Sequence, residues 1–179
     1  MAVIKKKIEP TDVLPKTVVS PQQLRIAAAQ RGIETSPLDV RAVIEKLFSI
    51  RVCMEQMDRE VSGYLERRGS TWVIGINIFH SPRRQRFTMA HELGHYLLHR
   101  DSLDGEKKIE LMLLRSDASN STQEKQANEF ASELLIPSKE LEKNIKDGID
   151  SIDMLSEVFE VSIAAIRYKA YKLGYLGRY

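Results

Sequence analysis

The chain has 179 residues, of which 42% are hydrophobic and 29% are charged, and its formal net charge is +2. This is the composition of one ordinary globular domain, and a net charge this small does not by itself predict nucleic-acid binding. No apolar run approaches the roughly 18 residues of a membrane span, and the N-terminus lacks the apolar core of a signal peptide. A single cysteine, Cys53, excludes an internal disulfide. We therefore expect a cytoplasmic protein with no membrane partner.

Residues 1–19 mix Lys, Pro and Val without a periodic pattern, and we expect a flexible arm there. Three Ser-Pro pairs then predict helix starts, because Ser is a favoured N-cap and Pro fits the first helical position. These pairs are Ser20-Pro21, Ser36-Pro37 and Ser81-Pro82. The first of these helices should stop at Gly32.

Three short segments between the second and third pairs have strand-like patterns, at residues 50–57, 61–67 and 72–79. The last is rich in β-branched and aromatic residues on both faces, which predicts an inner strand. Because the links between the segments are short, the simplest arrangement is an antiparallel meander. A small antiparallel sheet packed on the helix that follows would give an α+β domain.

The helix that begins at Ser81-Pro82 contains His91-Glu92-x-x-His95, the H-E-x-x-H pattern of zinc metallopeptidases. Four helical residues turn through about 400°, so the two imidazoles lie on one face, one turn apart, and can share a metal ion. Glu92 stands beside that face, where a carboxylate can take a proton from water at the metal. Because the flanking positions are strongly apolar, two imidazoles and a carboxylate would be costly there without a bound ion.

Three arginines, Arg83, Arg84 and Arg86, occupy the first turns of the same helix, where the helix dipole disfavours cations. They are candidates for substrate binding, or part of a solvated face. His99, at the other end, is a rival metal ligand. Its spacing falls short of the longer motif H-E-x-x-H-x-x-G-x-x-H, so a helix cap is the preferred interpretation.

A loop is expected at residues 100–108, and residues 109–114 could form an edge strand or a helix. The next predicted helix spans residues 122–136 and is ended by Pro137. At 100° per residue, Glu124 and Asn128 fall on its apolar face, whereas Glu129 and Glu133 fall on the opposite side and should face solvent.

Glu124 is thus a candidate third metal ligand, and Asn128 could orient a ligand histidine. The alternative role for Glu124 is a capping box with Ser121. A short helix is expected at residues 139–147, followed by Gly148.

The C-terminal segment is similar to a helix-turn-helix, with helices at residues 152–159 and 163–173 and Ser162 as N-cap of the second. Residues 161–179 contain four basic and no acidic residues. The preferred interpretation is a packing module that closes the domain rather than a DNA-binding element. The expected division is therefore an arm at residues 1–19, a metallopeptidase domain at 20–150 and a helix-turn-helix-like segment at 151–179.

Two blocks of sequence together resemble the ImmA/IrrE family of metallopeptidases. The first runs from Arg86 to His95, and the second contains Glu124-x-x-Ala127-Asn128-Glu129-Phe130-Ala131 and continues to Pro137. The resemblance implies a gluzincin-like zinc site with His91 and His95 as ligands, Glu124 as the third ligand and Glu92 as general base. It also implies that the substrate is a helix-turn-helix repressor, often encoded beside the peptidase. Ile136 stands where Met is more usual in the family.

These observations predict a zinc-dependent endopeptidase that cleaves a helix-turn-helix repressor in a phage, mobile-element or stress-response circuit. Mn²⁺ is an alternative metal. Tight DNA binding is not expected, because the basic charges are few and dispersed. The rival hypotheses are a non-enzymatic regulator that keeps the peptidase fold and binds a repressor or DNA, and an iron oxygenase with two histidines and one carboxylate. The glutamate directly after the first histidine favours hydrolysis.

Overall fold

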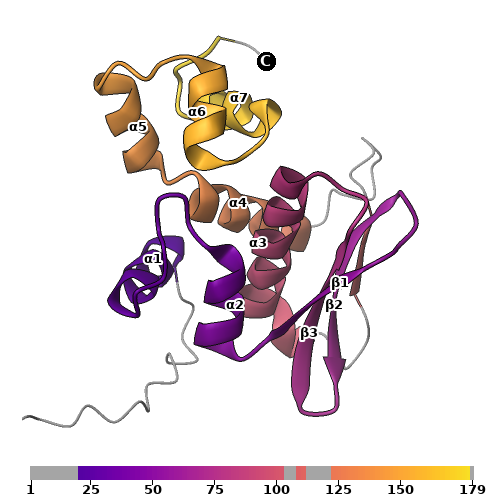
Figure 1. Ribbon diagram of the computed structural model, residues 1–179. Coiled ribbons are helices and arrows are strands. Elements are labelled where there is room, and N and C mark those ends of the chain that lie inside the picture. Colours follow the sequence, from indigo (N-terminus) through magenta and orange to yellow (C-terminus); the bar gives the residue numbers. More distant parts are fainter. Residues whose placement is uncertain (1–19, 103–107, 112–121, 178–179) are drawn as a thin grey trace, which may run out of the picture.

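The computed structural model describes residues 20–102, 108–111 and 122–177, so the arm expected at residues 1–19 lies outside the described residues (Figure 1). The first part contains helices α1 (Pro21–Gln30) and α2 (Val40–Phe48), strands β1 (Arg51–Glu55), β2 (Val61–Arg68) and β3 (Thr71–Asn77), helix α3 (Pro82–His99) and the 3-10 turn η1 (Arg100–Ser102). Strand β4 (Lys108–Leu111) follows, and then helices α4 (Thr122–Leu135), α5 (Ser138–Lys146), α6 (Ile152–Phe159) and α7 (Ile163–Lys172). The α+β class is confirmed.

The four strands form one mixed sheet in the order β1-β3-β2-β4. Strand β2 pairs antiparallel with β3, as the predicted meander requires, and it also pairs antiparallel with β4. Strand β1, however, pairs with β3 instead of β2, and in parallel. The prediction of a fully antiparallel meander was therefore wrong. Strand β3 is apolar on both faces, and between β1 and β2 it is buried along most of its length. Its predicted inner position is confirmed. Of the two alternatives for residues 109–114, the strand is correct over residues 109–111, and residues 112–114 lie outside the described residues.

Helix α3 packs against the sheet, where it contacts β2 and β3, and α4 packs beside α3 (Figure 1). The two helices approach closely at Gly94, where an added Cβ atom would lie 3.3 Å from the Cα atom of Ala127 and 3.2 Å from the ring of Phe130. Glycine at this position lets the backbones come together. Helices α1 and α2 cover the same pair, with α1 against α4 and α2 against α3.

Two of the three predicted helix starts are confirmed. Ser20 forms a capping box with Gln23. Ser81 and Pro82 begin α3, although the Ser81 side chain makes no capping hydrogen bond. The prediction for Ser36-Pro37 was wrong, because α2 begins only at Val40 and the pair lies in the preceding turn with a cis peptide bond. Asp39 is the N-cap instead, accepting a hydrogen bond from the Ala42 backbone N–H.

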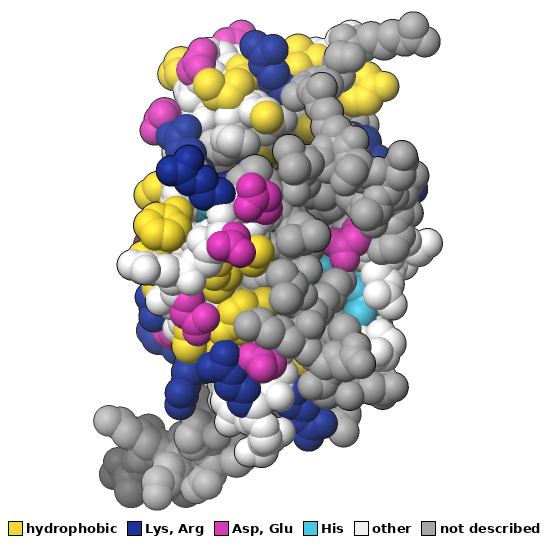
Figure 2. Space-filling model, turned by 90° about the vertical axis from the view of Figure 1, so that its right-hand side faces the viewer, with side chains coloured by type: hydrophobic (Ala, Val, Ile, Leu, Met, Phe, Trp, Pro, Cys, Tyr) yellow, Lys and Arg dark blue, Asp and Glu magenta, His cyan; other side chains and the backbone are white. Residues whose placement is uncertain are grey.

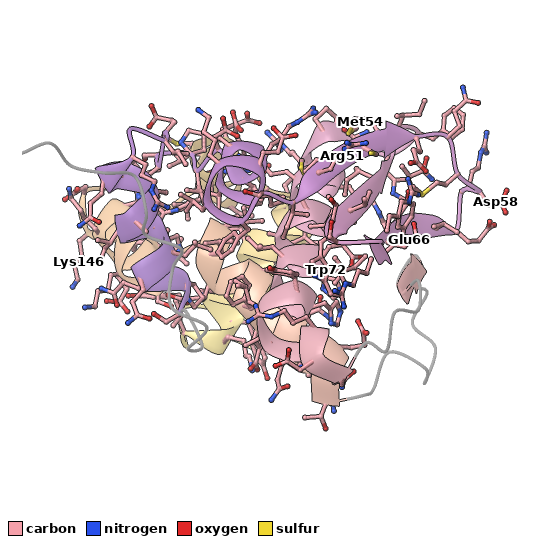
Figure 3. All side chains as sticks on the ribbon, turned by 90° about the horizontal axis from the view of Figure 1, so that it is seen from below. Arg51, Met54, Asp58, Glu66, Trp72 and Lys146 are labelled. Atoms are coloured by element: carbon pink, nitrogen blue, oxygen red, sulfur yellow. The ribbon has the colours of Figure 1, made fainter. Side chains whose placement is uncertain are left out.

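The C-terminal helices α6 and α7 form as expected, and the Ser162 hydroxyl caps α7 by accepting a hydrogen bond from the Ala165 backbone N–H. Leu155 and Phe159 of α6 and Ile166 of α7 belong to the same hydrophobic core as residues of α1 to α4. The division at residues 150 and 151 stays a prediction. In Figure 3, Asp58 and Lys146 lie at opposite ends of the molecule, so the β1–β2 link and α5 occupy opposite ends. No helix among the described residues is long and apolar enough to cross a membrane.

Candidate metal centre

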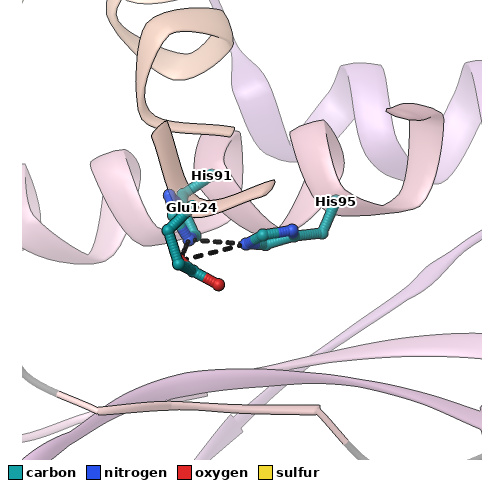
Figure 4. Close-up of side chains that lie close together, drawn as sticks. All are labelled: His91, His95 and Glu124. Carbon is teal, nitrogen blue, oxygen red and sulfur yellow. Dashed lines mark hydrogen bonds and ion pairs between the residues drawn. The ribbon is translucent and has the colours of Figure 1, made fainter. Parts of the chain in front are cut away.

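Two helices bring three metal-ligating side chains together. Helix α3 presents His91 and His95, and the first turn of α4 presents Glu124 (Figure 4). The two Nε2 atoms lie 2.9 Å apart, and one Glu124 carboxylate oxygen lies 3.2 Å from that of His91 and 3.4 Å from that of His95. The exposed fractions of His91, His95 and Glu124 are 2%, 0% and 9%. The ligand atoms of the three predicted residues therefore lie close together in the interior of the protein.

The donor set and its spacing fit a divalent ion. A tetrahedral zinc with Zn–N distances of about 2.0–2.1 Å holds two ligand atoms about 3.3 Å apart. The observed separations of 2.9, 3.2 and 3.4 Å are within a few tenths of an ångström of this value. Two imidazoles and one carboxylate are also the ligand types of catalytic zinc sites, which keep a fourth position for water.

Asn128 lies where the sequence places it, one turn after Glu124. Its Oδ1 atom lies 3.0 Å from His91 Nδ1, so the amide oxygen can accept a hydrogen bond from the Nδ1–H group of the ring. With Nδ1 protonated, His91 Nε2 keeps a lone pair, which points towards the ligand atoms of His95 and Glu124. A histidine needs such a lone pair to bind a metal ion. On its other side, the His91 ring stacks on Phe87, with ring centroids 6.3 Å apart.

Glu92, the predicted general base, is fully buried at 0% exposure. Its carboxylate is not part of the three-residue cluster, although it follows His91 directly on α3. This is the expected arrangement for a residue that moves protons without binding the ion.

The three arginines at the start of α3 have different surroundings. Arg83 donates a hydrogen bond to Ser156 and forms an ion pair of 2.5 Å with Glu157, both on α6. Arg86 lies 3.6 Å from the carboxylate of Glu160, and burial lowers the pKa of its guanidinium. Two of the three therefore help to attach the C-terminal helices.

The third arginine, Arg84, contacts the sheet. Its Nη2 atom donates a hydrogen bond of 3.0 Å to the hydroxyl of Ser62. Arg84 also lines a cavity of about 540 Å³ that begins beside His91, as Arg83 does. Arg86 is not among the residues that line this cavity.

Glu129 and Glu133 do not join the metal cluster, but the expectation that both face solvent was wrong for Glu133. Lys169 of α7 forms an ion pair of 2.5 Å with Glu133, and Ser138 donates hydrogen bonds to the same carboxylate. Burial alone would raise the pKa of Glu133, but these hydrogen bonds hold it below its usual value. Glu129 stays exposed, 3.6 Å from Lys172.

His99 is buried at the end of α3, with its ring centroid 5.5 Å from that of His95, and it is not part of the three-residue cluster. Ser121, the alternative capping partner of Glu124, lies outside the described residues.

Sequence reasoning missed one part of the site. Val161, Ser162, Ala165 and Tyr168 line the cavity beside His91, so the C-terminal pair forms one of its walls. The apolar spacing of the pair predicted two packed helices but gave no sign of which surface they would cover. The ion pair between Glu133 and Lys169 helps to hold the pair there, but helical phase alone does not reveal such a contact.

Comparison with known proteins identifies the fold and the family. A solved structure of a Mycobacterium tuberculosis transcriptional regulator matches with a TM-score of 0.59 and 19% sequence identity. The match covers 88% of this chain and 47% of the regulator, so the chain spans about half the length of that protein. No curated protein matches the chain in sequence. The peptidase family M78, described as the IrrE N-terminal-like domain, matches residues 45–171, which include His91, His95 and Glu124. The chain therefore belongs to this family of the IrrE N-terminal-like domain and has the fold of a metallopeptidase.

Proposed function

We propose that this protein is a zinc-dependent endopeptidase that cleaves a helix-turn-helix transcriptional repressor encoded near it. The observation that carries the proposal is the convergence of His91, His95 and Glu124, whose ligand atoms lie within 4.8 Å of one another at a buried point. Membership of a metallopeptidase family supports the same chemistry.

In this mechanism His91, His95 and Glu124 would hold the ion, and Asn128 keeps the His91 ring oriented through the 3.0 Å contact. A bound zinc ion would polarise a water molecule and the peptide carbonyl, and would lower the pKa of that water to about 7. Glu92 takes a proton from the attacking water and later delivers it to the leaving amine. Its burial protects this transfer from exchange with bulk solvent.

The proposed substrate class rests on the resemblance to the ImmA/IrrE family, and the regulatory name of the structural relative agrees with it. Cleavage would remove the repressor and relieve repression. Direct tight binding to DNA is not part of the proposal. The face drawn in Figure 2 mixes acidic and basic side chains rather than presenting one sign of charge, and the net charge is only +2. The single Cys53 supports a reducing compartment such as the cytoplasm.

The test uses the full chain with the repressor encoded nearest to it. The zinc-loaded protein is incubated with that repressor, and products are identified by mass spectrometry. Glu92→Gln serves as the matched variant, with metal content measured on the same preparations. We expect one or a few cuts by the wild type and a loss of about 10²–10⁴-fold in rate in Glu92→Gln, with metal retained. Reloading the apoprotein with Mn²⁺ tests the alternative metal.

A parallel incubation with labelled duplex DNA tests the rival regulator. Several phosphate contacts would make affinity fall steeply with salt, by about 0.9 log units per log unit of salt for each contact. Tight, salt-sensitive DNA binding with an intact repressor would replace the peptidase by a non-enzymatic regulator. Cleavage by Glu92→Gln at the wild-type rate would instead remove the proposed base.

A further inference from the structure

The cavity beside His91 is lined mainly by apolar side chains, and the charged side chains of its described lining are positive. Phe87, Leu135, Ile136 and Val161 contribute apolar surface from α3, from α4 and the residue after it, and from the turn before α7. Arg83 and Arg84 are the charged side chains among the described residues that line it, and no Asp or Glu does so. A cavity of this kind selects for a ligand that carries a negative charge next to apolar groups.

The two arginines differ in whether their charge is neutralised. Arg83 is paired with the Glu157 carboxylate at 2.5 Å. Arg84 forms no ion pair with a carboxylate of the described residues; its partner is the neutral hydroxyl of Ser62. The Arg84 Nε atom is buried and has no hydrogen-bond partner in the described part of the chain. A guanidinium that lines a cavity and is neutralised by no carboxylate can form a charge-assisted hydrogen bond with a carboxylate that enters the cavity.

The position of Arg84 on α3 determines how far this residue lies from His91 and thus from the proposed site of cleavage. Arg84 and His91 are seven residues apart, which is two turns, so they lie on the same face of the helix about 10.5 Å apart along its axis. An extended peptide advances about 3.3–3.6 Å per residue, so this separation corresponds to about three residues of substrate.

Strand β2 fixes the guanidinium at this place. Val61 and Gly63 pair with the adjacent residues Leu111 and Glu110 of β4, so Ser62 is the extra residue of a β-bulge. A bulge redirects the side chain at its centre. The Ser62 hydroxyl thereby reaches Arg84 on α3, while Gly63 packs against Thr88 of the same helix.

We propose that Arg84 determines substrate specificity by binding a carboxylate of the peptide within about three residues of the cleaved bond. This inference rests on the proposed peptidase function. The carboxylate is either an Asp or Glu side chain or the free C-terminus of the substrate. The apolar walls would hold the aliphatic part of the same residue or of its neighbour.

The test uses a mixture of peptides from a digested bacterial proteome, split into one half with free C-termini and one half with amidated C-termini. Cleavage products of the zinc-loaded wild type are sequenced by mass spectrometry to give the residue preference around each cut. In a second readout, the same peptides are passed over immobilised Glu92→Gln protein, which measures retention without cleavage. Both readouts are repeated with Arg84→Ala, Arg84→Lys and Arg84→Glu.

We expect wild-type cuts to be enriched for Asp or Glu within three residues of the cleaved bond, in both halves of the mixture. A preference confined to the half with free C-termini would identify the terminal carboxylate as the group that Arg84 binds. Arg84→Ala should lower retention of acidic peptides about ten- to hundredfold. Arg84→Lys should keep part of the preference, and Arg84→Glu should change it towards Lys and Arg. Arg167→Ala is the matched control, because Arg167 is exposed on α7 outside the cavity lining.

Metal content and thermal unfolding of each variant show that the fold is kept. Cleavage with no acidic preference, or with the same preference in Arg84→Ala, would overturn the role of Arg84 and leave the peptidase intact. Retention of acidic peptides that depends on Arg84, without any cleavage by the wild type, would support the role of Arg84 while removing the proposed function. A protein that neither cuts nor retains acidic peptides would overturn the inference.

Discussion

The side of α4 that meets α3 is lined with small residues, whereas the side that meets α7 carries charged ones. Towards α3, Ala127 and Ala131 are fully buried and Ala127 lies against Gly94. Towards α7, Glu133 and Glu129 pair with Lys169 and Lys172. The first contact is held by close packing of backbones, and the second has an ionic rim around a shared apolar core.

This difference separates two tasks along the same helix. Close packing tolerates little displacement, so it suits a contact that must hold His91, His95 and Glu124 within a few tenths of an ångström. Ion pairs at a partly exposed rim are weaker and are screened by salt. We therefore expect the pair α3–α4, which carries the candidate metal ligands, to be the more rigid part. The wall that α6 and α7 provide for the cavity should respond more to solution conditions.

The largest effect should come from removing the carboxylate on the metal side of α4. Glu124→Ala should lower metal affinity by more than about a hundredfold, beyond the 10–100-fold typical of groups that only support a ligand. Glu129→Ala and Glu133→Ala are the matched controls, because they remove the same group from the other side of the helix. Metal titration by calorimetry decides the comparison. Equal affinity in all three variants would mean that the third ligand lies elsewhere, with His99 the next candidate.

The packing contact is tested by Gly94→Val. An added Cβ would already lie 3.2 Å from the Phe130 ring, and two further methyl groups have no room between the helices. We expect a loss of about 1–3 kcal/mol in the free energy of unfolding, together with weaker metal binding. Valine forms helices better than glycine, so a loss of stability cannot come from helix propensity. Ala164→Val, on the exposed face of α7, controls for placing a β-branched side chain in a helix. If Gly94→Val bound the metal as tightly as the wild type, the packing of α3 on α4 would not set the position of Glu124.

The hydrogen bond behind His91 should have a smaller effect. Asn128→Ala removes the 3.0 Å contact to Nδ1 and leaves the three ligands in place, so metal affinity should fall about 10–100-fold. Asn128→Asp, which keeps an acceptor at that place, should restore much of it. Ser132→Ala, one turn further along α4, provides the control. Unchanged affinity in Asn128→Ala would show that stacking on Phe87 is enough to orient the ring.

The smallest effect is expected at the ionic rim, and it depends on pH. Because the folded-state pKa of Glu133 lies below its ordinary value of 4.5, its stabilising contribution is complete above that value and is lost as the pH falls through the folded pKa. Glu133→Gln should therefore cost up to about 1 kcal/mol at pH 7 and progressively less below about pH 4.5. Amide hydrogen exchange in α7 measures it, with Glu129→Gln as the exposed control. A cost that stayed constant down to pH 3 would rule out the ion pair as its source.

The closeness of the candidate metal ligands was predictable because it depends on local periodicity. The spacing of His91 and His95, and the phase of Glu124 and Asn128 on one helix, follow from the geometry of a regular helix. The two helices bring these residues together because the apolar face of each helix packs into the same hydrophobic core. The structure brings all four side chains together as expected.

The errors lie where non-local contacts decide. The insertion of β3 between β1 and β2 depends on pairing between distant residues, which short links do not reveal. Helical phase gave the direction of Glu133 but not the presence of Lys169, 36 residues later, on the surface it faces. At Ser36-Pro37 the Ser-Pro pattern was misleading, because the helix is capped by the carboxylate of Asp39, three residues after Ser36.

The bulge at Ser62 makes the selectivity of this site sensitive to chain length as well as to side-chain identity. Side chains alternate between the two faces of a strand, so deleting one residue turns those before it to the other face. A deletion at Ser62 would restore regular pairing with β4 and withdraw the hydroxyl from Arg84, without touching α3 or α4. Relatives that differ by a single insertion or deletion in this strand should therefore bind the same metal and yet prefer different peptides.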